Sequence, residues 1–253
     1  MGLYSSRMVG EIGNALNQKW TMPYIIWLLN HHNGLTEAEV SNLIGLIEKF
    51  HMDSPMLGEF CIALAPAGKA MSQPAQPTIG RKVVNLTMEK IRFIESIIDS
   101  RRNKPLRGQA CLALSGVLAS MGDSAEINKR RLDLIRKAII NAADTKIGEV
   151  TVADLAKEEI YRMTKLSKNA TAPELIGRDS QSQPMKLSDF RGKVVVLVFW
   201  TSWEQSIEVL DYLRKLEQSY RGKRVQIVGV NRDSLSNLRE IEMAQKSVGK
   251  NFS

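Results

Sequence analysis

The chain of 253 residues is 43% hydrophobic, 25% charged and 6% aromatic, which are ordinary values for a folded protein and exclude wholesale disorder. Its formal net charge of +8 permits an acidic partner, but no aromatic residues alternate with the basic ones, so we predict no nucleic-acid binding. The longest apolar run in the first half, residues 24–29, is too short to cross a bilayer, and polar residues occupy the place of a signal peptide's apolar core. We therefore predict neither a membrane-spanning segment nor a signal peptide in this chain.

The first two thirds of the sequence reads as helices. Thr36 and Glu39 form a capping box, in which a hydroxyl and a carboxylate satisfy the first amides of a helix. Apolar residues then recur at spacings of three and four, as one face of a helix requires. Similar stripes predict further helices at 55–64, 91–98, 106–121, 125–143 and after Thr151, with a surface loop at 66–80. No strands intervene, which predicts an all-α domain at residues 1–166.

The two cysteines lie in related octets, GEFCIALA around Cys61 and GQACLALS around Cys111, fifty residues apart. Each octet has an apolar helical pattern, so we interpret both cysteines as buried structural thiols and the octets as a duplicated helix-packing unit. No His or Cys falls at metal-ligand spacing, so we predict no metal and no cofactor. The basic clusters at 101–107 and 129–137 are interpreted as solvated helix faces and turns. The histidines are interpreted as caps at helix C-termini: His31, His32 and His51.

The pattern changes after Lys165. Residues 165–193 are polar and contain two prolines, which predicts a linker followed by a loose hairpin. The run 194–200 is continuously apolar and rich in valine, typical of a strand covered on both faces. A helix with an apolar stripe follows and ends at Gly222; residues 224–230 form the next strand, and Ser234 caps one more helix. The order β-α-β-α predicts a parallel strand pair with a right-handed crossover.

Residues 172–203, APELIGRDSQSQPMKLSDFRGKVVVLVFWTSW, resemble the opening of the TlpA/ResA branch of thioredoxin-like proteins, in the redoxin superfamily. That branch reads A-P-x-F, a hairpin with an Asp, L-S-D-[YF]-R-G-K, an apolar strand and then F-W-x-x-W-C-x-x-C. VGVNRDS at 228–234 is similar to the end of its next strand, and the helical part resembles, more weakly, the extension that precedes this domain in some large TlpA-like proteins. The resemblance implies an α + α/β fold: an N-terminal all-α domain at 1–166, then a partial thioredoxin-like βαβα domain at 167–253.

The chain departs from the family at its redox cysteines. The position of the nucleophile holds Glu204, and that of the resolving cysteine holds Ile207. The residues that flank these positions are Trp200, Trp203, Gln205 and Ser206. A carboxylate at a helix N-terminus keeps the favourable electrostatic environment but cannot attack a disulfide. We therefore predict no catalytic residue and a redox-inactive domain that acts as a binding or structural module. Two smaller departures are Ser182 for the family's Gly and Tyr212 for its Pro.

Two other functions stay open at this point. One is an active thiol-disulfide oxidoreductase, or a peroxiredoxin-like antioxidant, that uses Cys61 or Cys111; the other is a basic helical domain that binds an acidic partner. The partner expected for the leading hypothesis is a protein that the sequence does not identify. The resemblance implies export to the oxidising side of a bacterial inner membrane, and also a second half-domain with a cis-proline loop. The last expected helix is followed only by VGKNFS, which is too short for that half. Either the helical domain or a second chain covers the apolar surface that this would leave, or the sequence is a fragment of a longer protein.

Overall fold

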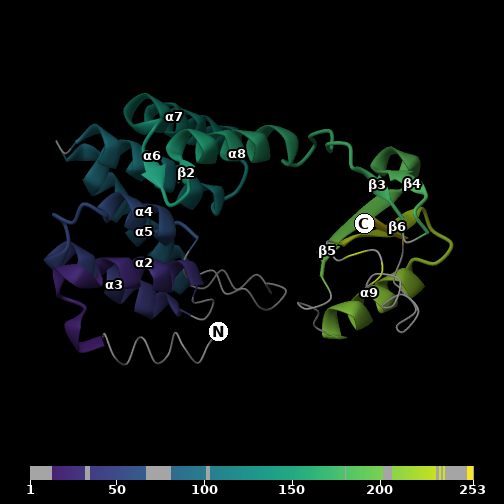
Figure 1. The fold of residues 1–253 in the computed structure, drawn as a ribbon, viewed down its shortest axis with the longest axis horizontal. Coiled ribbons are helices and arrows are strands. Elements are labelled where there is room, and N and C mark those ends of the chain that lie inside the picture. Colours follow the sequence, from purple (N-terminus) through teal and green to yellow (C-terminus); the bar gives the residue numbers. More distant parts are fainter. Residues whose placement is uncertain are drawn as a thin grey trace. The chain divides into compact units, whose positions relative to one another are not determined.

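The computed structural model describes residues 13–31, 35–66, 81–100, 103–179, 181–201, 207–231, 234, 236 and 250–252. The chain divides into two compact units, Met1–Ala170 and Thr171–Ser253 (Figure 1). The first unit is helical apart from one short hairpin, and the second contains a parallel sheet. The fold class is α + α/β, as the sequence predicts.

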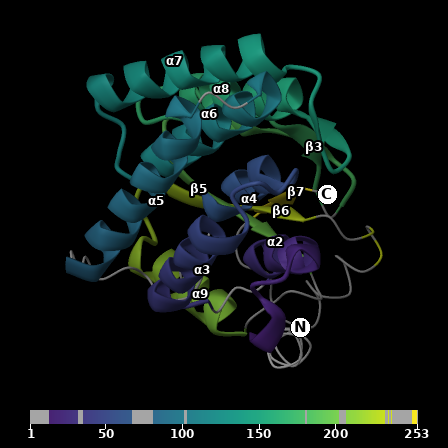
Figure 2. The ribbon, with the colours of Figure 1, turned by 90° about the vertical axis from the view of Figure 1, so that its left-hand side faces the viewer.

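The helical unit has its elements in an order close to the predicted one. They are η1 (Gly13–Ala15), η2 (Lys19–Thr21), α2 (Met22–His31), α3 (Glu37–Phe50), α4 (Leu57–Leu64), α5 (Arg81–Asp99), α6 (Lys104–Ala119), α7 (Ala125–Ala142), β1 (Lys146–Ile147), β2 (Val150–Thr151) and α8 (Val152–Lys165). Within this unit α2 and α3 lie at one end and α7 and α8 at the other (Figures 1 and 2). The predicted surface loop at 66–80 falls almost entirely outside the described residues.

Side-chain caps determine where several of these helices begin. The Thr36 hydroxyl accepts from the Glu39 amide at 3.3 Å, and the Glu39 carboxylate accepts from the Thr36 amide at 2.7 Å. Thr151 and Asp154 make the same reciprocal pair at the start of α8, at 3.2 and 3.1 Å. Helix α6 begins two residues before the predicted start, because the Asn103 side chain accepts from an amide of its first turn at 2.9 Å and proline is tolerated there.

The two cysteine octets belong to two consecutive helix pairs, α3–α4 and α5–α6. Residues fifty positions apart are buried in both pairs: Leu43 and Phe93, Ile44 and Ile94, Ile47 and Ile97, Cys61 and Cys111, and Leu64 and Leu114. Helix α3 packs against α5, and α4 packs against α6. Equivalent helices therefore contact one another, as they do in tandem-repeat proteins. The shared burial pattern of the two helix pairs therefore extends beyond the octets in which the sequence shows it.

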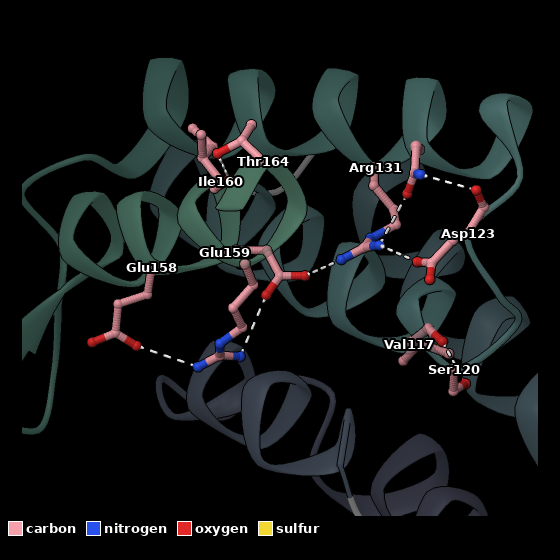
Figure 3. Close-up of polar contacts among 10 residues, drawn as sticks. Val117, Ser120, Asp123, Arg131, Glu158, Glu159, Ile160 and Thr164 are labelled. Carbon is pink, nitrogen blue, oxygen red and sulfur yellow. Dashed lines mark hydrogen bonds and ion pairs between the residues drawn. The ribbon is translucent and has the colours of Figure 1, made fainter. Parts of the chain in front are cut away.

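A buried ion pair connects α7 and α8 (Figure 3). The side chain of Arg131 is only 6% exposed, and its guanidinium pairs with Glu159, while Asp123 lies 3.9 Å away. Glu159 also accepts from Arg162 at 3.4 Å. The interpretation of the basic cluster at 129–137 as a solvated helix face is therefore wrong for Arg131. Helix α8, which the local sequence of α7 cannot reveal, covers this residue and supplies its carboxylate.

The second unit consists of a hairpin and a three-stranded parallel sheet. Its elements are β3 (Ile176–Arg178), β4 (Pro184–Lys186), η3 (Leu187–Phe190), β5 (Val194–Trp200), α9 (Ile207–Ser219), β6 (Val225–Asn231) and β7 (Lys250–Phe252). Strands β3 and β4 are antiparallel, and the sheet order is β5-β6-β7. Helix α9 crosses between β5 and β6, which pair in parallel from Val194↔Val225 to Trp200↔Asn231. This confirms the predicted parallel pair.

The sheet differs from the sequence-based expectation in two respects. Strand β7, which we did not predict, pairs in parallel with residues 228–230 of β6. Strand β5, which we expected to be covered on both faces, has Val194 66% and Phe199 70% exposed, and its other residues are half-buried. Among the described residues β5 pairs with β6 alone, and the buried apolar side chains of the sheet lie on the central strand, at Ile227 and Val228. The helix expected after Ser234 lies mostly outside the described residues.

Candidate functional site

The candidate site is the carboxyl end of β5, where the chain leaves the sheet and enters α9. In open parallel sheets, ligand-binding groups gather at the carboxyl ends of the strands. Strand β5 ends at Trp200 and β6 ends beside it at Asn231, whose buried side-chain amide donates to the Trp200 carbonyl oxygen at 3.3 Å. The buried hydroxyl of Thr201, the next residue, makes no hydrogen bond within the described part of the chain. The sequence analysis did not predict Asn231 as a site residue, although a polar residue at the end of an apolar strand is a signal of such a site.

The sequence-predicted site residues are only partly described. Trp200 is the last residue of β5, and Ile207 is the first residue of α9. The other four lie outside the described residues: Trp203, Glu204, Gln205 and Ser206. The roles assigned to these six positions remain predictions.

The hairpin that precedes β5 explains two of the family-like motifs. The Asp179 carboxylate accepts from the amides of Gln181 and Gln183 at 2.9 and 2.8 Å, which closes the turn. Ser182 has a φ of 65°, a left-handed conformation that glycine adopts without steric cost. The glycine usual in the family therefore suits this position, and the serine is held there by its surroundings.

The L-S-D-F-R-G-K motif fixes the entry of the chain into β5. The Glu174 carboxylate accepts from the Ser188 amide at 2.9 Å, and the Asp189 carboxylate accepts from the Lys186 amide at 2.8 Å. The hydrogen bonds from Ser188 lower the pKa of Glu174, because they stabilise the charged form. Gly192, with a φ of 82°, makes the last turn before the strand. These residues position the strand and have a structural role.

Both cysteines lie in the core of the helical unit, in α4 and α6, and both are reduced. Burial raises the pKa of the Cys61 thiol to about 12. It also raises the pKa of Cys111, with Lys137 and Arg107 acting in the opposite direction. The prediction of buried thiols is confirmed, and a thiol with a pKa near 12 has about one thiolate in 10⁵ molecules at neutral pH.

The described residues contain no group of three or more His, Cys, Asp or Glu side chains that could hold a metal ion. A hollow of about 400 Å³ opens at the opposite end of the sheet, where α9 ends and β6 begins, and is lined in part by Tyr220, Arg221 and Lys223. It is therefore remote from the carboxyl end of β5. Within the described ranges, every helix is too short or too polar to cross a bilayer.

Comparison with known proteins finds sequence similarity between the second unit and the redoxins. Residues 169–252 match the AhpC/TSA family. The thiol-disulfide oxidoreductase ResA of Geobacillus kaustophilus is 29% identical over 106 residues, which cover 42% of this chain and 59% of that protein. The ResA of Bacillus thuringiensis subsp. konkukian is 29% identical over 89 residues, which cover 35% and 48%. The chain thus spans less than two thirds of the length of either relative.

A solved structure is also similar: the thioredoxin domain of a thiol-disulfide oxidoreductase from Bacteroides vulgatus, with 26% identity, a TM-score of 0.32, and coverage of 35% of this chain and 64% of that one. The AhpC/TSA match at residues 169–252 includes the motifs from Ala172 to Ser234. By these sequence matches, the C-terminal part of the chain is similar to the TlpA/ResA branch of thioredoxin-like proteins.

Proposed function

We propose that this domain is a redox-silent relative of the thiol-disulfide oxidoreductases and that the chain acts as a binding or structural module for another protein. The observation that carries the proposal is the residue pair at the family's cysteine positions, Glu204 and Ile207. Thiol–disulfide exchange proceeds through attack by a thiolate and a mixed disulfide. A carboxylate and an aliphatic side chain cannot take part in either step.

The beginning of α9 supports the assignment of an anion-favouring position. A helix N-terminus presents unpaired amides and about half a positive charge, which in this family would lower the pKa of a thiol. Helix α9 begins at Ile207, three residues after Glu204. A carboxylate near such a helix end is stabilised by about 0.3–1 kcal/mol without gaining reactivity toward sulfur. In this proposal the chain keeps a helix N-terminus that favours an anion near position 204 but has no cysteine thiol there.

The burial of the two cysteines argues against a substitute thiol. Cys61 and Cys111 are the only cysteines in the sequence, and both belong to the core of the helical unit. The raised pKa of each disfavours the thiolate that a peroxidase or an oxidoreductase would need. Export to the oxidising side of a bacterial membrane stays a part of this proposal and rests on the family resemblance alone.

An insulin-reduction assay with dithiothreitol tests the loss of activity. We expect the wild-type chain and a Cys61→Ser/Cys111→Ser variant to be equally inactive, because neither buried thiol takes part. We also expect iodoacetamide to modify both wild-type cysteines slowly in the native state and rapidly after unfolding. Wild-type turnover above that of the cysteine-free variant would overturn the proposal.

A restored variant tests whether positions 204 and 207 are the family's redox positions. We expect Glu204→Cys combined with Ile207→Cys, made in the cysteine-free background, to have one thiol with a pKa below the ordinary value of about 8.5. The rate of alkylation as a function of pH measures this pKa. The matched control is Gln218→Cys in the exposed last turn of α9, which should keep an ordinary thiol pKa. Equal pKa values for the two variants would show that the alignment of Glu204 with the nucleophile is wrong.

A further inference from the structure

The hollow of about 400 Å³ in the second unit lies at the amino end of the parallel sheet, where the chain leaves α9 and turns into β6. Its volume falls within the range of pockets that hold small molecules, about 300–1,000 Å³. Polar side chains from the helix, the turn and the strand contribute to its lining: Glu217, Gln218, Tyr220, Arg221, Lys223 and Gln226. Because the candidate site described above is at the carboxyl end of β5, a ligand in this hollow is independent of positions 204 and 207.

The turn after α9 holds two cations on the lining of the hollow. Gly222, between Arg221 and Lys223, has a φ of 81°, a left-handed conformation that costs glycine little. The Arg221 amide donates to the Gln218 carbonyl oxygen at 3.2 Å, and the Lys223 amide donates to that of Tyr220 at 3.0 Å. Backbone amides thus satisfy carbonyl oxygens at the end of α9, and the two basic side chains are not used as caps. The Lys223 ammonium lies 5.0 Å from the centre of the Tyr220 ring.

The beginnings of β5 and β6 bring two further cations to the same end of the sheet. Val194 pairs with Val225, so the residues that precede them, Lys193 and Arg224, belong to neighbouring strands at this end. The Val194 amide donates to the Arg224 carbonyl oxygen at 2.8 Å. The Lys193 ammonium donates to the side-chain oxygen of Gln226 at 3.3 Å, which places it beside the lining of the hollow.

Positive charge at this end of the sheet exceeds negative charge. The segments 186–193 and 217–227 contain six basic residues and two acidic ones, Asp189 and Glu217. The Asp189 carboxylate already accepts from a backbone amide, at 2.8 Å. Within the described part of the chain, no carboxylate forms an ion pair with the cations of the two strands and the turn, which are Lys193, Arg221, Lys223 and Arg224. Cations at a helix C-terminus offset the helix dipole, but those of the strands lie outside α9. The excess charge beside a hollow therefore favours an anionic ligand.

We propose that this hollow binds the phosphate group of a soluble small molecule. A phosphate group presents several strong acceptor oxygens, and the lining offers donors of three kinds: the guanidinium of Arg221, the ammonium of Lys223 and the hydroxyl of Tyr220. Arginine binds phosphate with its planar fork of N–H groups, and lysine binds it as a point charge. Glu217 precedes Arg221 by one helical turn and repels an anion, so its removal should tighten binding.

Titration of the full chain with inorganic pyrophosphate, followed by ¹H–¹⁵N NMR, tests this proposal. We expect saturable shifts of the amides of residues 217–226. The variant Arg221→Gln/Lys223→Gln should bind pyrophosphate about tenfold or more weakly, because two charge-assisted hydrogen bonds are lost. The matched control, Lys165→Gln/Lys168→Gln, removes the same charge from exposed positions of the helical unit. It should change the affinity less than about twofold, because distant exposed charges are screened.

Two further measurements sharpen the test. Glu217→Gln should bind pyrophosphate about twofold more tightly, because a repulsive charge beside the anion is removed. Citrate, a carboxylate anion, should bind more weakly than pyrophosphate. Circular dichroism must first show that each variant folds like the wild type; Lys223→Gln alone, with a smaller expected loss, replaces the double variant if that variant does not fold.

The contrary outcomes are distinct from one another. Equal pyrophosphate affinity of the double variant and its control would overturn the proposal, as would shifts that do not saturate and spread over the basic residues of both units, since either result means attraction by net charge alone. Equal affinity for citrate would show that the hollow does not select phosphate. Binding to phosphatidylglycerol vesicles that Arg221→Gln/Lys223→Gln abolishes and pyrophosphate does not compete for would make a lipid headgroup the source of the phosphate, and the assignment to a soluble molecule would be wrong.

Discussion

Replacement of Gly108 by alanine should destabilise the helical unit, because helices α6 and α7 touch at this residue. An added Cβ would overlap the Cβ of Ala142 and would lie 3.0 Å from the carbonyl oxygen of Ala138 and 3.1 Å from the amide nitrogen of Ala142. Carbon atoms in ordinary contact are about 3.5–4.0 Å apart. Backbone atoms cannot rotate away as a flexible side chain can, so the two helices must separate.

The size of the effect follows from two opposing terms. Overpacking of a well-packed core costs about 1–3 kcal/mol, and alanine in a helix interior is favoured over glycine by about 1 kcal/mol. We therefore expect a net loss of up to roughly 2 kcal/mol in the free energy of unfolding. For a unit of this size, such a loss corresponds to a decrease of up to about 8 °C in the thermal midpoint.

Urea unfolding followed by far-UV circular dichroism measures this loss. The matched control is Gly45→Ala in α3, where no heavy atom lies within 4 Å of the added Cβ. The control should raise the free energy of unfolding by up to about 1 kcal/mol, because only the helix propensity changes. If Gly108→Ala proves as stable as Gly45→Ala, the close approach of α6 and α7 is not what requires glycine at 108.

Two further predictions concern the charged groups of the helical unit. Glu159→Ala should lower the free energy of unfolding by about 3–5 kcal/mol, because it leaves the buried Arg131 without its nearest carboxylate. The control, Arg162→Ala, removes an exposed side chain and should lower it by less than about 1 kcal/mol. Equal losses for the two variants in urea unfolding would contradict this account. Hydrogen bonds from Thr151 lower the pKa of Asp154 in the folded state. The ionised Asp154 therefore stabilises the fold above the unfolded-state pKa of about 4, and this stabilisation is lost as the pH falls through the lowered folded-state pKa. Acid unfolding of Asp154→Asn should therefore depend less on pH between about 5 and 2 than that of the wild type, and parallel curves would exclude the cap as the cause.

Local signals in the sequence predicted much of the helical unit. The capping box of Thr36 and Glu39 and the threonine before α8 both mark helix starts that the structure confirms. A cap is an interaction within about four residues, so its chemistry is legible in the sequence. The polar segment with its two prolines likewise predicted the hairpin, and the order of apolar runs and helix from 194 to 230 predicted the parallel pair of β5 and β6.

Long-range packing decided what the sequence did not predict. Strand β7 has three residues, too few for a pattern, and it is recognisable only through its pairing with β6. Strand β5 has the composition of a fully covered strand, yet Phe199 is exposed because the described sheet leaves β5 with one neighbour. The local sequence does not distinguish Arg131 from its exposed basic neighbours, because the carboxylate that pairs with it, Glu159, belongs to α8.

The sequence by itself shows glutamate at position 204 and isoleucine at position 207, and it predicts that these positions correspond to the two cysteines of the TlpA/ResA branch. Tertiary structure decided the burial of the cysteine thiols and the solvent exposure of the outer face of α2. Enclosure by segments distant in the chain raises the pKa of Cys61, and the end position of α2 leaves Trp20 and Tyr24 in solvent. Burial depends on residues that are distant in the sequence and pack together in the folded chain, so a local sequence pattern cannot predict it.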